Sequence, residues 1–155
     1  MPADRWFGVG SCVGDQERAG ARAADDALIH DDPNLLIVFC SQAYNLRQLL
    51  RQIRARAGDV PLIGCTTAGE IATAGPSDAS VVVAALGGSG FAVRTAVASE
   101  VSGSLREAGA RVARSLPDRA DLPHQVAGFY TYGEIARVRG VRGFHNQTLV
   151  VLAIS

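Results

Sequence analysis

Apolar residues along the chain follow two spacings that alternate. Runs of strand length that are apolar at nearly every position, such as Leu35–Ser41, are typical of strands buried on both faces of a sheet. Other segments, such as residues 43–57, repeat apolar residues every three or four positions, which is the spacing of an amphipathic helix. Strands that alternate with helices predict an α/β fold with right-handed crossovers.

These spacings predict a mixed, mainly parallel sheet with about three helices. Asp15 is placed to cap the first helix, and the alanine-rich inner face of that helix allows it to lie close to the sheet. Gly58 is placed to end the second helix. The expected strands are Trp6–Val13, Leu35–Ser41, Leu62–Thr67, Ser80–Leu86, Phe91–Ser99, Val126–Thr131 and Gln147–Ile154, and the expected helices cover residues 16–30, 43–57 and 103–116.

The chain contains an internal repeat. The sequence LIGCTTAGEIA, which starts at residue 62, recurs as VAGFYTYGEIA from residue 126, an offset of 64 residues. The apolar spacing of the preceding helix recurs too, because the pattern that begins at Leu46 begins again at Leu105. The shared order of elements makes chance similarity a poor explanation. We therefore expect two related strand–helix–strand–loop–strand units, near residues 35–87 and 91–155.

Each copy of the repeat places a Thr-x-Gly-Glu-Ile motif where a strand ends. The first copy supplies Thr67 and Glu70, and the second supplies Thr131 and Glu134, with Tyr130 just before them. Ligands of α/β proteins bind outside the carboxyl ends of the strands, so these side chains are predicted ligand contacts. Two alternatives remain: the glutamates are solvated in a polar turn, or they are structural anchors that accept hydrogen bonds from the loop backbone.

A polar cluster around His145 and Asn146 precedes the last expected strand. Asn146 can orient a ligand, and His145 can hydrogen-bond a ligand, transfer protons or bind haem iron. Alternatively, both side chains hold their own loop in place. Neither His30 nor His124 lies at zinc-ligand spacing from His145, which argues against a zinc site. The predicted ligand contacts are Thr67, Glu70, Tyr130, Thr131, Glu134, His145 and Asn146.

Composition and charge narrow the function classes. A chain of 155 residues that is 48% hydrophobic and 19% charged suits one globular domain. Its net charge of +0 argues against a general binder of nucleic acid or anionic membranes, which needs a cationic face. No apolar run reaches the roughly 20 residues of a membrane span, and the first residues lack a signal-peptide pattern. We therefore expect a cytoplasmic protein.

The sequence lacks the common motifs of catalysis. It contains no Walker loop, no zincin histidine pair and no Gly-x-Ser-x-Gly elbow, and the glycines that follow Gly8 do not have dinucleotide-fingerprint spacing. Cys12, Cys40 and Cys65 lie in apolar segments without a Cys-x-x-Cys pair, which favours small core side chains over disulfides or zinc ligands. We expect no enzymatic activity and no resident cofactor unless His145 binds haem.

With these residues in view, the chain resembles the FIST family of bacterial sensory domains. The segments LLIVFCSQAYNLRQLL, PLIGCTTAGEI and SVVVAALGGSGF resemble the start of the FIST N region, so that residues 1–118 are similar to it. The segment QVAGFYTYGEIARVRGVRGFHNQTLVVLAIS, within residues 124–155, resembles the end of the FIST C region. The long middle that family members carry is missing. We expect residues 1–155 to form a single compact, shortened FIST-like domain.

The resemblance implies a cytoplasmic input domain of bacterial signal transduction. Its partners would be histidine kinases, diguanylate cyclases or chemotaxis-type proteins, and its ligands small polar molecules such as amino acids. Two alternatives remain: a haem-binding nitric-oxide sensor, and a structural or assembly module without a ligand. Strands that are apolar on both faces need cover on both sides, so we also expect a homodimer.

Overall fold

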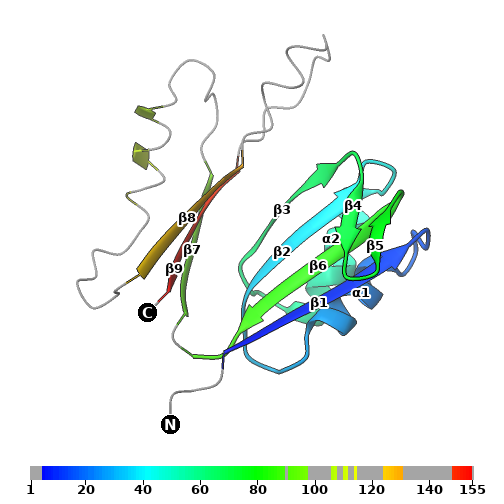
Figure 1. The fold of residues 1–155 in the computed structure, drawn as a ribbon, viewed down its shortest axis with the longest axis horizontal. Coiled ribbons are helices and arrows are strands. Elements are labelled where there is room, and N and C mark those ends of the chain that lie inside the picture. The colour runs from blue at the N-terminus through cyan, green and yellow to red at the C-terminus, as the bar shows by residue number, and fades with distance from the viewer. Residues whose placement is uncertain are drawn as a thin grey trace. The chain divides into compact units, whose positions relative to one another are not determined.

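The computed structural model describes residues 5–89, 91–97, 106–107, 110–111, 114, 124–130 and 148–154. The chain divides into two compact units, residues 1–89 and 90–155. The elements of the first unit are, in chain order, β1 (Trp6–Val13), α1 (Ala19–Ala27), β2 (Pro33–Ser41), α2 (Leu46–Ala57), β3 (Leu62–Thr67), β4 (Glu70–Ala72), β5 (Gly75–Ser77) and β6 (Ser80–Gly87) (Figure 1).

The main sheet of the first unit has the strand order β1-β6-β2-β3. β6 is antiparallel to β1 and β2, whereas β2 and β3 are parallel, so β1, β2 and β3 share one direction. The expected mixed α/β architecture is confirmed. Parallel pairing is less extensive than predicted, because the chain turns back through the β4–β5 hairpin and β6 enters between β1 and β2. Within the described residues, β2–β3 is the one parallel pair.

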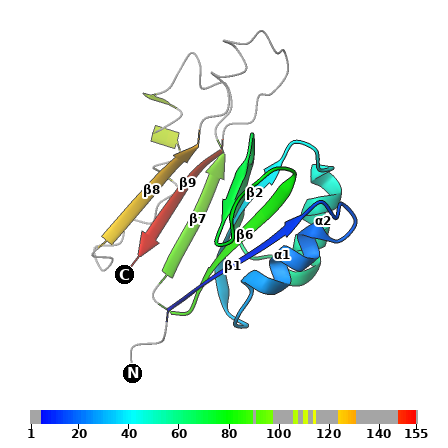
Figure 2. The ribbon, with the colours of Figure 1, turned by 45° about the vertical axis from the view of Figure 1, so that its right-hand side comes forward.

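Both helices of the first unit lie on the same face of the main sheet (Figure 2). α1 presents a small inner face to the sheet, as the sequence predicts. Gly8 and Gly10 of β1 lie directly beneath it, and a side chain at either position would overlap the backbone carbonyl of Ala27 or Ala23. Close contact between α1 and β1 therefore depends on these two glycines. The buried inner residues of α1 are Ala19, Gly20, Ala23, Ala24 and Ala27.

The helix ends follow local capping chemistry. α1 is shorter than the predicted residues 16–30, because residues 16–18 form a turn. The Asp15 carboxylate caps that turn by accepting a hydrogen bond from the backbone N–H of Arg18 at 3.1 Å. α2 begins after Asn45, whose side chain accepts a hydrogen bond from the N–H of Gln48 at 3.2 Å. It ends at Gly58, which adopts a φ of 64° in the left-handed region.

The core lies between the helices and the main sheet. Trp6, the chain's one tryptophan, closes one end of it: its ring N–H donates to the Asp32 carboxylate at 2.7 Å. The Trp6 and His30 rings also meet in an edge-to-face arrangement, with ring centroids 5.5 Å apart. Trp6 fluorescence therefore reports on the first unit. Its larger fully buried apolar side chains are Leu35, Leu36, Leu49, Ile53, Val81 and Val83.

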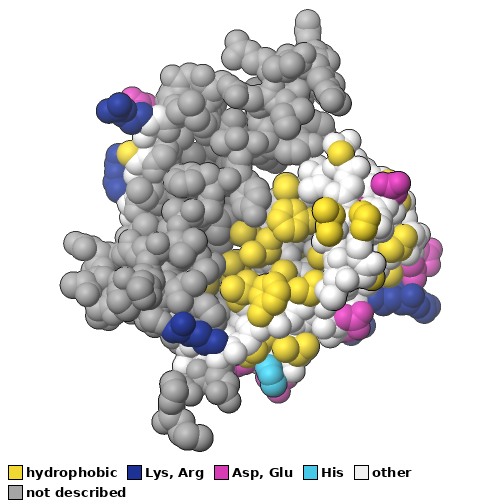
Figure 3. Space-filling view, in the orientation of Figure 1, with side chains coloured by type: hydrophobic (Ala, Val, Ile, Leu, Met, Phe, Trp, Pro, Cys, Tyr) yellow, Lys and Arg dark blue, Asp and Glu magenta, His cyan; other side chains and the backbone are white. Residues whose placement is uncertain are grey.

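The opposite face of the main sheet also gathers apolar side chains, which Figure 3 shows over the strands. Phe7, Val9 and Val13 alternate along β1, and their exposed fractions are 60%, 36% and 61%. None of the four strands carries a charged residue. The predicted homodimer remains a prediction that this face motivates.

The second unit contains β7 (Phe91–Val97), β8 (His124–Tyr130) and β9 (Thr148–Ile154). These strands pair antiparallel in the order β7-β9-β8. β7 and β8 therefore share one direction, as β2 and β3 do, but β9 separates them, whereas β2 and β3 are neighbours. The two copies of the repeat thus share their strand directions but differ in the order of their strands within the sheet.

The expected third helix, residues 103–116, lies mostly outside the described residues. The described residues 106–107 and 110–111 are helical. The two complete helices of the described chain, α1 and α2, are therefore one fewer than the sequence predicts. Among the described residues, no helix is long and apolar enough to cross a membrane.

Candidate functional site

Strand direction brings four loops to one edge of the main sheet. β1, β2 and β3 end there and β6 begins there, since Ser41 pairs with Thr67 and Val13 pairs with Ser80. We call this the carboxyl edge and define it as residues 13–15, 41–45, 67–70 and 78–80. It is where the sequence placed the first Thr-x-Gly-Glu motif, and it is the usual ligand position in α/β sheets.

Glu70 is the most buried charged residue of the carboxyl edge, with an exposed fraction of 2%. One carboxylate oxygen accepts a hydrogen bond from the Thr67 hydroxyl. The other accepts from the backbone N–H of Ser80 at 3.2 Å and from the Ser80 hydroxyl at 2.9 Å. The Ser77 hydroxyl donates to the Ser80 hydroxyl oxygen at 2.8 Å. Glu70 thus has the geometry of a structural anchor, which joins the end of β3 to the start of β6 across the β4–β5 hairpin.

A second set of hydrogen bonds fixes the return of the chain into β6. Ala79 has a φ of 53°, a left-handed conformation that costs an alanine on the order of 1 kcal/mol or more. Its carbonyl oxygen accepts from the Tyr44 hydroxyl at 2.8 Å and from the Gly14 N–H at 3.1 Å. This conformation also directs the N–H of the next residue, Ser80, at Glu70. The loops after β1 and β2 therefore hold the hairpin in place.

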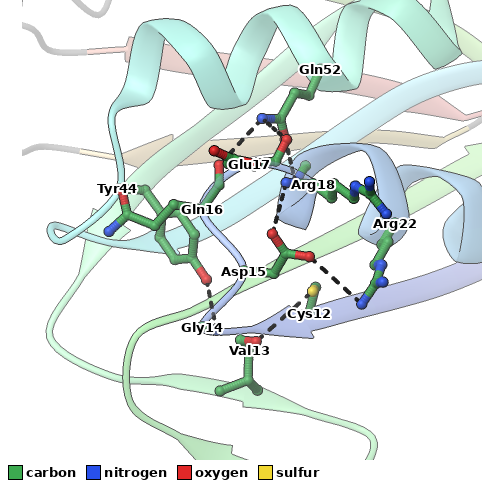
Figure 4. A network of polar contacts seen from close by, with 11 residues as sticks. Cys12, Val13, Gly14, Asp15, Gln16, Glu17, Arg18, Arg22, Tyr44 and Gln52 are labelled. Atoms are coloured by element: carbon green, nitrogen blue, oxygen red, sulfur yellow. Dashed lines mark hydrogen bonds and ion pairs between the residues drawn. The ribbon is translucent and has the colours of Figure 1, made fainter.

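The turn between β1 and α1 is held just as firmly, as Figure 4 shows. The Gln52 side-chain amide of α2 accepts from the N–H of Gly20 at 2.9 Å and donates to the carbonyl oxygens of Glu17 and Gln16 at 2.7 and 3.3 Å. Asp15 lies 3.7 Å from the Arg22 guanidinium. One amide thus ties the start of α1 to α2 and makes this turn a scaffold for the carboxyl edge.

Two thiols near this edge, the buried Cys40 and the partly buried Cys65, are poor nucleophiles. Burial, followed by the negative charge of Glu70 and by Cys65, raises the pKa of Cys40 from 9.0 to about 11. Burial also raises the pKa of Cys65. Because the thiolate is the nucleophile, these raised pKa values keep both thiols protonated and weakly nucleophilic near neutral pH. All three cysteines are free; Cys40 is buried, whereas Cys12 and Cys65 are partly buried. Among the described residues, no group of three or more His, Cys, Asp or Glu side chains could hold a metal ion.

An open depression of about 430 Å³ lies on the β4–β5 hairpin, beside the Glu70 anchor. Its volume is within the range of small-molecule sites. Ile71 contributes an apolar wall and is 80% exposed, and Asp78 contributes an exposed carboxylate. The lining residues are Gly69, Glu70, Ile71, Pro76, Ser77 and Asp78.

The sequence-predicted site residues divide into three groups. Thr67 and Glu70 are brought into direct contact at the carboxyl edge. Tyr130 ends β8, where the backbone is described. The other predicted contacts lie outside the described residues and stay predictions: Thr131, Glu134, His145 and Asn146.

Sequence reasoning missed three parts of this edge. Tyr44 carries no motif, and its position two residues before the α2 helix gave no sign of a role after β1 or before β6. The left-handed conformation of Ala79 is invisible in the sequence, because alanine does not favour it. Ser80 offered one usable signal, because a hydroxyl within ten residues of a glutamate is a natural donor to its carboxylate; Ser77 donates to Ser80 in turn.

Comparison with models of known protein families shows which family the chain belongs to. The FIST N domain model matches residues 34–155, which include β2 from Asn34 onward, the hairpin and all of the described second unit. The chain belongs to the FIST N domain family. This match confirms the resemblance to the FIST family found in the sequence. FIST domains are sensors of signal transduction. The match also extends through residues 124–155, the segment that resembles FIST C. No curated protein matches the chain.

Proposed function

We propose that this FIST chain is a non-catalytic sensory module that binds a small polar ligand at the carboxyl edge. The observation that carries the proposal is the hairpin depression beside Glu70, at the strand ends where α/β proteins place their ligands. The signal-transduction role of the family supports a sensory function.

In this proposal Glu70 acts as a positioning residue. Its carboxylate is occupied by donors from Thr67 and Ser80, so it shapes the hairpin that the ligand contacts. Ligand contacts then come from the exposed surface of the same hairpin, chiefly Ile71 and Asp78. A rigid wall of this kind lowers the ordering cost of binding.

Binding is favoured over catalysis by the state of the reactive groups at this edge. The Cys40 and Cys65 thiols have raised pKa values and stay protonated near neutral pH. The Glu70 carboxylate is buried and held by three donors, so it lacks the access to substrate that a general base needs.

We further propose that the module works in the cytoplasm of a bacterial cell as the input of a signalling protein. A histidine kinase, a diguanylate cyclase or a chemotaxis-type protein is the expected partner, since FIST domains serve signal transduction.

Thermal unfolding in the presence of an amino-acid and metabolite panel tests the function. A ligand at about 100 times its Kd stabilises the folded state by about 2.7 kcal/mol. Ile71→Arg places a long side chain in the depression and should abolish the stabilisation. Ile29→Arg is the matched control, because Ile29 is also exposed but lies outside the depression. A panel without any stabilising compound, or equal stabilisation of both variants, would show that the site is wrong.

A further inference from the structure

The charged residues described in the lining of the hairpin depression are all acidic. Two of its described lining residues, Glu70 and Asp78, are acidic, and none of the others is basic. The Asp78 carboxylate is exposed and forms no hydrogen bond or ion pair within the part of the chain that the structure describes. It lies close to Gly69, whose Cβ, if present, would be 3.9 Å from an Asp78 carboxylate oxygen. A carboxylate at the rim of a depression is an acceptor for a cationic or donor group of a ligand.

The depression also has an apolar side, whose exposure the packing of the fold does not explain. Ile71 is 80% exposed, the largest exposure among the large apolar side chains of the described residues. The same isoleucine follows the glutamate in the second copy of the motif, as Ile135. Pro76 pairs with Ile71 across the hairpin, so the two apolar side chains share one side of it. An alkyl chain of a ligand can cover both.

From these two features we propose that the depression binds an aliphatic amine that lacks a carboxylate. The assignment rests on the proposed function and names its ligand class. The ammonium group pairs with Asp78, and the alkyl chain packs on Ile71 and Pro76. An amino acid offers the same ammonium and side chain, but its carboxylate would meet the negative charge of the exposed Asp78 without a basic partner among the described lining residues.

Matched probe pairs test this assignment, because each pair differs by one carboxylate. Isothermal titration of the full chain compares cadaverine with L-lysine, and isopentylamine with L-leucine. We expect each amine to bind at least about threefold more tightly than its amino acid, within the range of an exposed ion pair. The preference should shrink in high salt.

Two aspartate variants locate the effect. Asp78→Asn should weaken cadaverine binding about threefold and remove the preference for amines. Asp31→Asn, a matched change of another exposed aspartate outside the depression, should leave both unchanged. Equal or tighter binding of the amino acids, or an unchanged preference in Asp78→Asn, would overturn the amine assignment and leave the proposed function standing. If no amine, amino acid or panel metabolite binds, the proposed function fails as well.

Discussion

Replacing Glu70 with alanine is expected to destabilise the first unit by about 3 kcal/mol. The substitution leaves three donors without their acceptor: the Thr67 hydroxyl, and the hydroxyl and N–H of Ser80. The two hydroxyls can rotate toward other partners, but the buried Ser80 N–H cannot. An unsatisfied buried donor costs about 1–3 kcal/mol, and a hydrogen bond to a charged group contributes about 1.5–3 kcal/mol. The free energy of unfolding of a whole domain is only about 5–15 kcal/mol, so a loss of about 3 kcal/mol would remove a large share of it.

Urea unfolding followed by Trp6 fluorescence measures this loss directly. Glu70→Gln keeps the shape and one acceptor oxygen, so it should cost only about 1 kcal/mol. Glu17→Ala, which removes an exposed glutamate side chain, is the control and should stay within about 0.5 kcal/mol of the wild type. A double-mutant cycle with Ser80→Ala should show a coupling of at least about 0.5 kcal/mol. If Glu70→Ala is as mild as Glu17→Ala, the anchor interpretation is wrong.

Three further predictions test the packing, the buried thiol and the assembly. Gly10→Ala should destabilise the first unit by more than about 1 kcal/mol, because the new side chain overlaps the backbone of α1; Ser11→Ala, on the other face of β1, should be nearly neutral in the same urea experiment. The raised pKa of Cys40 means that the folded state holds the thiol proton more tightly, so its contribution to stability is full below pH 9.0 and is lost as the pH rises through about 11. Urea unfolding between pH 8 and 11 should show this loss of about 2–3 kcal/mol in the wild type and not in Cys40→Ala. Parallel pH profiles of the unfolding free energy for the two proteins would contradict it. We also propose a homodimer, for which light scattering at micromolar protein should report about twice the 16.2 kDa chain mass and Phe7→Lys should lower it; a wild-type monomer that stays soluble when concentrated would refute the dimer.

The elements of this fold could be predicted where one spacing dominates. β3 matches its predicted range Leu62–Thr67, and α2 ends at Ala57, just before Gly58, because a glycine after an amphipathic run is a strong local stop signal. The position of Thr67 and Glu70 at the strand ends followed from the same pattern. Local chemistry was sufficient for these features.

Features that depend on contacts distant in the sequence could not be predicted. The place of β6 between β1 and β2 is decided by pairing of whole strands, so the sequence predicted too much parallel pairing. β4 and β5 have three residues each, too few to show an alternating pattern. The anchor role of Glu70 depends on Ser80, ten residues later, and was one of three interpretations that the motif alone left open.

Nuclear magnetic resonance of the ¹⁵N-labelled chain tests the central claim most directly. The chain is titrated with whichever panel compound stabilises it most. The account predicts that the amide signals of the hairpin depression, from Gly69 to Ile71 and at Ser77 and Asp78, shift with ligand concentration, while those of α1 stay in place. Shifts that fall outside the hairpin and spare these residues would contradict a ligand site at the carboxyl edge.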